Sequence, residues 1–157
     1  MEQAAAREPL DAAALRELVA EGRAVVLTSA VHPPERPCAV GAGLLTKVNA
    51  NIGTSKDYAD IERELRKLAA AEAAGADTVM DLSTGGDIGA IRKEIIARAT
   101  VPVGSVPVYE AGAMAAERGK RVVDMTAAEM MQAVRNHMAD GIAFVTIHCG
   151  VTQDVMR

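Results

Sequence analysis

Short apolar runs, each followed by a polar cluster, recur four times along the chain. The segments are TKVNANIGTS (46–55), DTVMDLSTGGD (77–87), VPVGSVPVYEAG (101–112) and FVTIHCGVT (144–152). The apolar runs have strand length and alternate with helical sequence, so the pattern predicts parallel strands joined by helices. Polar side chains at the carboxyl ends of parallel strands are where an α/β barrel keeps its active site.

Helices are expected after the first, second and third strands. The first should begin near Tyr58 with Asp57 as its N-cap, and Asp87 should cap the second. Thr126 and Glu129 have the spacing of a capping box that opens the third helix. The fold class predicted from this alternation is α/β, a parallel (β/α) barrel of the TIM type, with about the first four βα units in this chain.

Two regions are expected. Residues 1–45 should form an N-terminal helix capped by Asp11, a strand over 23–31 and a proline-rich connector over 32–37. Residues 46–157 should form the first half of the barrel, truncated after the fourth strand, whose unpaired edge would favour association.

Composition and charge disfavour some classes of binding partner and some cellular locations. Half of the 157 residues are hydrophobic, and the net charge of −4 comes without a basic run, which disfavours nucleic-acid and membrane partners. Neither a secretory signal nor an 18-residue apolar run is present, so a cytoplasmic protein is expected. Cys38 and Cys149 form no CxxC motif and are expected to be free thiols that make no metal site.

Several strand-end residues are candidates for ligand contact. The carboxamide of Asn51 suits a heterocycle or a ribose, whereas Asn49 is expected to satisfy loop backbone groups. Tyr109, expected at the end of the third strand, can hydrogen-bond a substrate oxygen, and His148 is the strongest candidate for acid–base chemistry or metal binding. From the residues alone, Met80 is expected to pack in the core.

Other polar residues leave alternatives open. Asp81 is equally suited to act as a general base or to pair with a cation such as Lys47, while Glu110 is undecided. His137 is expected to be a packed or partly exposed helical residue. The glycine-rich loops at 53–55 and 83–86 could hold a phosphate but are better explained as tight turns.

Taken together, KVNANIGTS, GADTVMDLSTGGDI, VPVGSVPVYEAG and TIHCGVT resemble the phosphomethylpyrimidine synthase family, also called ThiC. The resemblance implies a radical S-adenosylmethionine lyase of thiamine biosynthesis that acts on aminoimidazole ribotide and is a homodimer at full length. It also implies that Asn51, Met80, Tyr109 and His148 contact substrate, which replaces the core interpretation of Met80.

The family's [4Fe-4S] cluster, S-adenosylmethionine and zinc ligands match no residues of this sequence, so the chain is expected to be inactive alone. Three alternatives remain. One is 5-hydroxybenzimidazole synthase, which acts on the same ribotide. Another is a non-catalytic half-barrel that dimerises and binds a nucleotide. The third is a Schiff-base enzyme that uses Lys47.

Overall fold

The computed structural model describes residues 1–147 of the 157-residue chain. The helices are α1 (Glu2–Ala5), α2 (Ala12–Ala20), α3 (Ile61–Ala73), α4 (Ile88–Arg98), α5 (Pro107–Glu117), the 3₁₀ helix η1 (Val122–Asp124) and α6 (Ala127–Asp140). The strands are β1 (Ala24–Leu27), β2 (Cys38–Gly41), β3 (Asn49–Ile52), β4 (Thr78–Asp81), β5 (Val103–Ser105) and β6 (Phe144–Val145).

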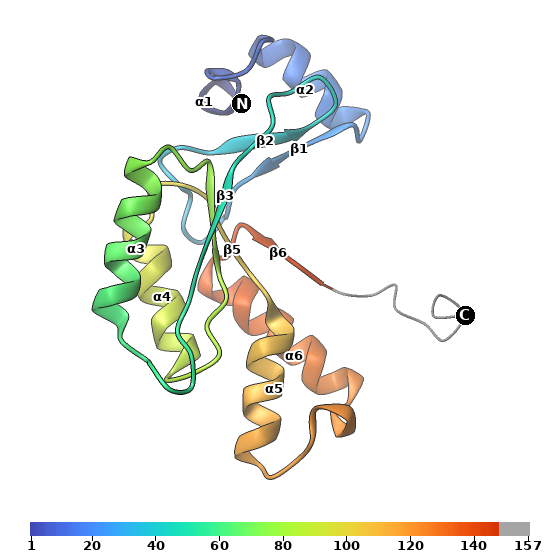
Figure 1. The fold of residues 1–157 in the computed structure, drawn as a ribbon. Helices are drawn as coiled ribbons and strands as arrows, with labels where there is room; N and C mark the ends of the chain where they lie inside the picture. Colours follow the sequence, from blue (N-terminus) through green and yellow to red (C-terminus); the bar gives the residue numbers. More distant parts are fainter. Residues whose placement is uncertain (148–157) are drawn as a thin grey trace, which may run out of the picture.

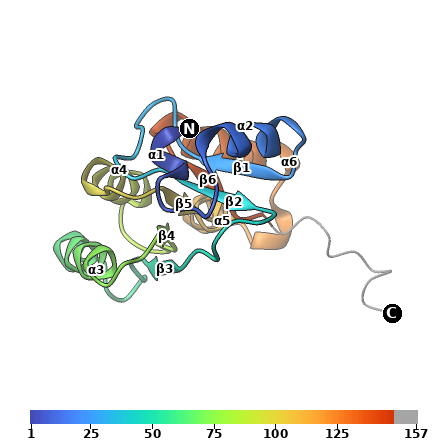
Figure 2. The ribbon, with the colours of Figure 1, turned by 90° about the horizontal axis from the view of Figure 1, so that it is seen from above.

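Strands β3 to β6 form a parallel sheet in chain order (Figure 1). Each strand is joined to the next through helices, as parallel neighbours require. Viewed from above, α3 and α4 lie beside the sheet on one side (Figure 2). The predicted mixed α/β class with a parallel sheet is therefore confirmed, and closure into a barrel stays a prediction.

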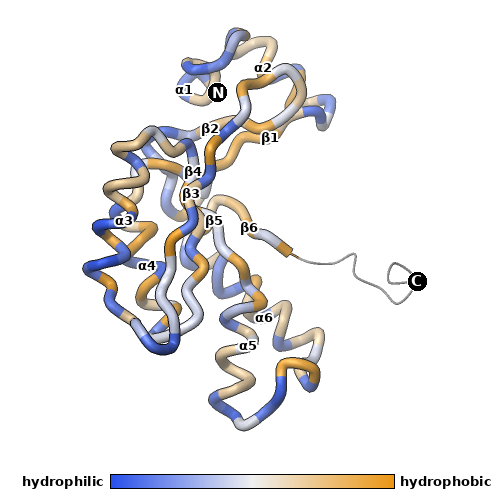
Figure 3. Tube along the Cα trace, viewed as in Figure 1, coloured by the Kyte–Doolittle hydropathy of each residue, from blue (hydrophilic) through white to orange (hydrophobic). Residues whose placement is uncertain are grey.

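One face of the sheet packs on helices. Val79 and Val103 point into a core that α3 and α4 complete with Leu68, Ile91 and Ile95. Apolar and polar residues alternate along α3 accordingly (Figure 3). Aliphatic side chains fill this core because the chain has only three aromatic residues, two Tyr and one Phe.

The opposite face carries a row of four residues in register. Asn51 pairs with Met80, Met80 with Gly104, and Gly104 with Phe144. Neighbouring strands in register present these side chains on the same side. The Phe144 ring lies directly over Gly104, where a Cβ atom would overlap the ring. Asn51 is exposed and Met80 is partly exposed, so this face is more open than the helix-covered one.

The first part of the chain has its own small core. Strands β1 and β2 pair antiparallel, and Leu15 of α2 packs against Ala24 of β1 and Ala39 of β2. Asp11 caps α2 by accepting a hydrogen bond from the Ala14 N–H at 2.8 Å, as predicted. Within residues 1–147, no helix has the length and apolar character needed to cross a lipid bilayer.

Three sequence predictions about elements are wrong. The third strand does not reach Tyr109: β5 ends at Ser105, and Pro107 opens α5, which was not predicted. Proline is well suited there because the first turn of a helix needs no N–H from it. Asp60, not Asp57, caps α3, since Ser55 and Tyr58 exchange backbone hydrogen bonds in a turn that precedes the helix. Strand β2 was also missed.

Replacing Gly104 with alanine should destabilise the protein by about 1–3 kcal/mol, because the new methyl group would overlap the Phe144 ring. Urea unfolding measures the change. Gly89→Ala is the matched control: its Cβ would meet nothing closer than 3.6 Å, and alanine stabilises a helix by about 0.5–1 kcal/mol. Equal stability of Gly104→Ala and wild type would show that the ring does not cover this position.

Candidate functional site

Asn51 and Met80 are neighbours on the open face of the sheet. The Asn49 side chain orients Asn51 by donating from Nδ2 to Asn51 Oδ1 at 2.9 Å, and Asn49 itself accepts from Thr78 Oγ1 at 2.8 Å. Asn49 thus supports other side chains and not the loop backbone, contrary to the sequence prediction. Within residues 1–147, the Nδ2 group of Asn51 donates to no protein acceptor, so it is available to a ligand.

Met80 is not a core residue. It is partly exposed, and its sulfur accepts a hydrogen bond from Thr146 Oγ1 at 3.7 Å. Thr146 follows β6, so this contact spans the sheet between the second and fourth parallel strands. A polarisable thioether on an open face can lie against a flat ring.

Tyr109 lies beyond the carboxyl end of β5, in the first turn of α5, and its side chain is 39% exposed. Strand β5 is next to β4, which carries Met80. Within the described part of the chain, the Tyr109 side chain makes no hydrogen bond to Asn51 or Met80. His148, the fourth predicted site residue, lies outside the described residues.

The two glycine-rich loops pack against each other. The Thr84 N–H donates to the Thr54 carbonyl at 2.9 Å, and the Thr54 hydroxyl donates to the Gly85 carbonyl at 2.6 Å. The N–H groups of Gly53, Thr54 and Ser83 are also occupied, by Glu64, Ser83 Oγ and Asp81. These contacts favour the tight-turn interpretation, because the donors named are already occupied by the protein and are not available to a phosphate.

Asp81 faces the helices and not the open face. Its neighbours in register are Ile52 and Ser105, it is 4% exposed, and Ser83 donates to it from both N and Oγ. Burial raises the pKa of Asp81, more strongly than the Ser83 hydrogen bonds lower it. Lys47, one possible cation partner, pairs with Glu8 and not with Asp81, and the buried position does not suit a base that must reach substrate.

Lys47 lies at the amino end of the sheet. Its ammonium pairs with Glu8 at 2.6 Å and donates to the Leu45 carbonyl at 2.6 Å. Both contacts occupy the amine that a Schiff-base mechanism would require to be free. The structure therefore gives the Schiff-base alternative no support.

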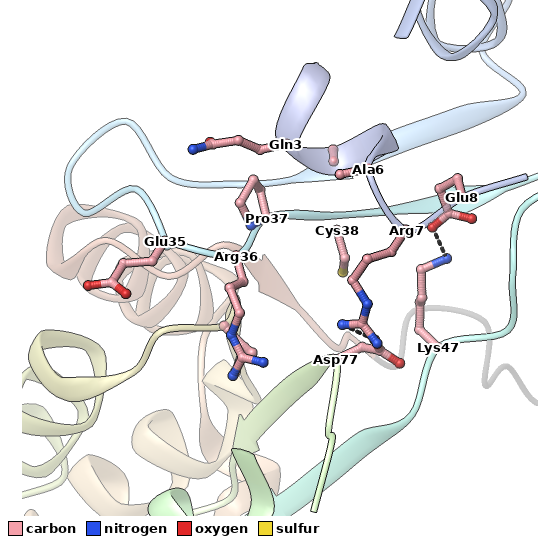
Figure 4. A pocket seen from close by; sticks show the side chains of 12 residues that line it. Gln3, Ala6, Arg7, Glu8, Glu35, Arg36, Pro37, Cys38, Lys47 and Asp77 are labelled. Atoms are coloured by element: carbon pink, nitrogen blue, oxygen red, sulfur yellow. Dashed lines mark ion pairs between the residues drawn. The ribbon is translucent and has the colours of Figure 1, made fainter. Parts of the chain in front are cut away.

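A cavity of about 280 Å³ lies at the same end, between the N-terminal part and the sheet. Figure 4 shows two ion pairs there, Arg7 with Asp77 at 3.2 Å and Lys47 with Glu8. Burial raises the pKa of the nearby Cys38 thiol to about 11 and outweighs the opposing effect of the Lys47 charge. Cys38 is therefore protonated near neutral pH, and thiols in that form are poor nucleophiles and ligands.

A buried polar cluster on the helix-facing side was not predicted. Arg92, only 1% exposed, donates from Nη1 to Glu110 at 2.5 Å and from Nε to Asp140 at 3.0 Å. His137 lies 3.0 Å from Glu110 through Nε2 and 2.6 Å from the Ser105 hydroxyl through Nδ1. The packed interpretation of His137 is confirmed. One feature of the sequence could have indicated this cluster: Arg92 lies among the isoleucines that α4 buries, one residue after Ile91.

Hydrogen bonds set the charge state of Glu110. Burial alone would raise its pKa, but donors on His137, Asn136 and Arg92 outweigh burial and lower the pKa to about 2. Glu110 is therefore ionised at neutral pH. It accepts hydrogen bonds from two helices, α4 and α6, which places it at the centre of the cluster.

The residues that the structure describes do not fit an iron–sulfur cluster or another metal. Within residues 1–147, no three His, Cys, Asp or Glu side chains are grouped so that they could hold an ion. The whole chain has two cysteines, whereas cysteine-ligated clusters take up to four thiolates from the protein. Any such group must therefore obtain most of its ligands from other residues.

The fold and the site define a class: a mixed α/β protein whose parallel sheet presents polar residues at its carboxyl end. A profile of the Radical SAM ThiC family matches residues 1–157, so the chain belongs to that family.

Named relatives agree with the profile. The chain is 52% identical over 153 residues to phosphomethylpyrimidine synthase 2 of Syntrophotalea carbinolica, covering 97% of this chain and 36% of that protein. It is 49% identical over 157 residues to phosphomethylpyrimidine synthase of Moorella thermoacetica, covering 100% of this chain and 36% of that protein. The chain therefore spans about a third of the length of the curated relatives it matches.

The pH dependence of stability should reveal the buried Glu110 carboxylate. Its pKa is about 2 in the folded state and about 4.3 when unfolded, so its stabilising contribution is complete above about pH 4.3 and is lost as pH falls towards 2. The free energy of unfolding, measured in urea at about pH 5 and about pH 3, should fall more for wild type than for Glu110→Gln between these two pH values. Glu117→Gln changes an exposed residue of the same helix, so its free energy of unfolding should depend on pH as that of wild type does. Parallel slopes for all three proteins would contradict the lowered pKa.

Proposed function

We propose that this chain forms one wall of the substrate pocket of a phosphomethylpyrimidine synthase and that its sheet is a sector of a parallel α/β barrel. The substrate would be aminoimidazole ribotide, converted to hydroxymethylpyrimidine phosphate. The observation that carries the proposal is the open-face row of Asn51, Met80, Gly104 and Phe144, in a chain whose relatives bear this enzyme's name.

Each proposed contact follows from the chemistry of the side chain. The free Nδ2 donors of Asn51 would bind a ring nitrogen or ribose oxygen, and Asn49 would hold the carboxamide in place. The Met80 thioether would lie against the imidazole ring. Tyr109, in the first turn of α5 beyond the end of β5, would hydrogen-bond a substrate oxygen, and His148 completes the proposed set.

The radical chemistry of the family requires a [4Fe-4S] cluster and S-adenosylmethionine, and we propose zinc as a further metal. Neither the cluster nor zinc fits the residues described above, so we assign both, together with S-adenosylmethionine, to the part of the relatives that this chain does not cover. The proposed role of this chain is to bind and orient the ribotide, and alone it would not catalyse the reaction.

A chimera tests the proposal. Residues 1–157 would replace the corresponding segment of the Moorella thermoacetica relative, to which they align over their whole length. We expect the chimera, with reconstituted cluster, S-adenosylmethionine and reductant, to form hydroxymethylpyrimidine phosphate. In this background Asn51→Ala should raise KM for the ribotide about tenfold, which corresponds to the loss of one or two hydrogen bonds.

Val123→Ala is the control, because Val123 is 80% exposed and distant in sequence from the row. It should leave KM unchanged. A folded chimera that binds the cluster but neither binds nor converts the ribotide would contradict the proposal. Equal KM values for Asn51→Ala and the unmutated chimera would remove Asn51 from the pocket.

A further inference from the structure

Helix α5 begins without a conventional cap. Its N-cap residue is Val106, whose side chain cannot accept a hydrogen bond from the N–H groups of the first turn, so only its carbonyl contributes, by accepting from the Tyr109 N–H at 3.1 Å. Polar N-caps typically stabilise a helix by about 1 kcal/mol, so this turn lacks an ordinary anchor. Tyr109 is in that turn, and its position therefore depends on other contacts.

Glu110, the residue after Tyr109, provides such contacts. It is 8% exposed, and its two carboxylate oxygens take donors from two other helices: Arg92 Nη1 of α4 at 2.5 Å and Asn136 Nδ2 of α6 at 2.8 Å. His137 Nε2 of α6 lies 3.0 Å away. These contacts hold the first turn of α5 from the side facing α4 and α6.

The donors are themselves held. Arg92 also bonds Asp140 at the last residue of α6, and His137 bonds Ser105 at the end of β5. The cluster thus ties the carboxyl end of β5 to α4, α5 and α6. Helices α5 and α6 lie side by side, so the tie acts over a short distance (Figure 1).

We propose that Arg92, Asn136 and His137 are positioning residues that fix Tyr109 by holding Glu110. Successive helical residues point about 100° apart, so anchoring Glu110 inward sets the rotation of the first turn and directs Tyr109 outward. The claim that Tyr109 then meets the ribotide rests on the proposed function. The claim that the cluster immobilises Tyr109 does not.

Tyrosine fluorescence of this chain tests the immobilisation directly. The chain has no Trp and two Tyr, so Tyr58→Phe leaves Tyr109 as the single fluorophore. Tyr58 is 53% exposed, and phenylalanine keeps the ring that Arg63 stacks on. Acrylamide quenching and time-resolved anisotropy then report the exposure and local motion of Tyr109.

Two variants in that background are matched. Glu110→Gln and Asp140→Asn each remove one carboxylate charge from Arg92, but only Glu110 belongs to α5. We expect Glu110→Gln to raise the quenching constant of Tyr109 about twofold and to add a fast anisotropy decay, while Asp140→Asn, which can act on Tyr109 only through Arg92, changes both much less. No change in Glu110→Gln, or equal changes in the two variants, would overturn the proposal.

If circular dichroism shows that either variant is unfolded, a milder pair replaces them. Asn136→Ala removes one donor to Glu110, whereas Gln132→Ala removes only the exposed partner of Asn136. The expected contrast is the same, and equal results for this pair would equally overturn the proposal. Since no ribotide is present, the outcome is independent of the chimera experiment, and failure of one proposal is distinguishable from failure of the other.

Discussion

The parallel pairing of β3 to β6 in chain order is the constraint on which the rest of the structure depends. It places the carboxyl ends of all four strands at one edge and gives each strand one helix-covered face and one more open face. Because side chains alternate along a strand, every second residue belongs to the same layer. The row of Asn51, Met80 and Phe144 and the buried pair of Asp81 and Ser105 are both consequences of this register.

The polar cluster around Arg92 buries several charged groups on the helix-covered side. A guanidinium that is almost fully buried is tolerated only when charges and hydrogen bonds compensate for its lost hydration. Glu110 and Asp140 provide the charges. Removing one partner of a buried pair typically costs about 3–5 kcal/mol, whereas apolar replacement of the whole cluster need not destabilise. The cluster is therefore better explained by specificity, since it fixes how three helices sit relative to β5.

Much of the scaffold could be predicted from the sequence, because local signals determine it. Asp11, Asp87 and the Thr126 capping box mark real helix starts, and the parallel strands fall within the segments predicted for them. Where local signals compete, the prediction failed. The segment 101–109 was predicted as a strand from its valines although Pro102 and Pro107 cannot donate to a ladder, and Pro107 in fact starts a helix that packs on α6.

The site was less predictable, because its buried partners are distant in sequence. Residues 92, 110 and 137 come from three helices, and nothing local indicates that they meet. Met80 shows the same limit. A methionine in a strand is usually a core residue, and it is the pairing of β4 with its neighbours that shows Met80 on the open side.

The open face of the sheet and the buried polar networks behind it are joined through the backbone of adjacent residues. Met80 lies on the open face and Asp81, the next residue, is held by Ser83 on the buried side. Tyr109 and Glu110 repeat this arrangement in α5. A residue that would meet ligand is thus followed each time by one fixed in a buried network. Such a pocket wall can be rigid even though its own side chains make few contacts, because its rigidity comes from the layer behind it.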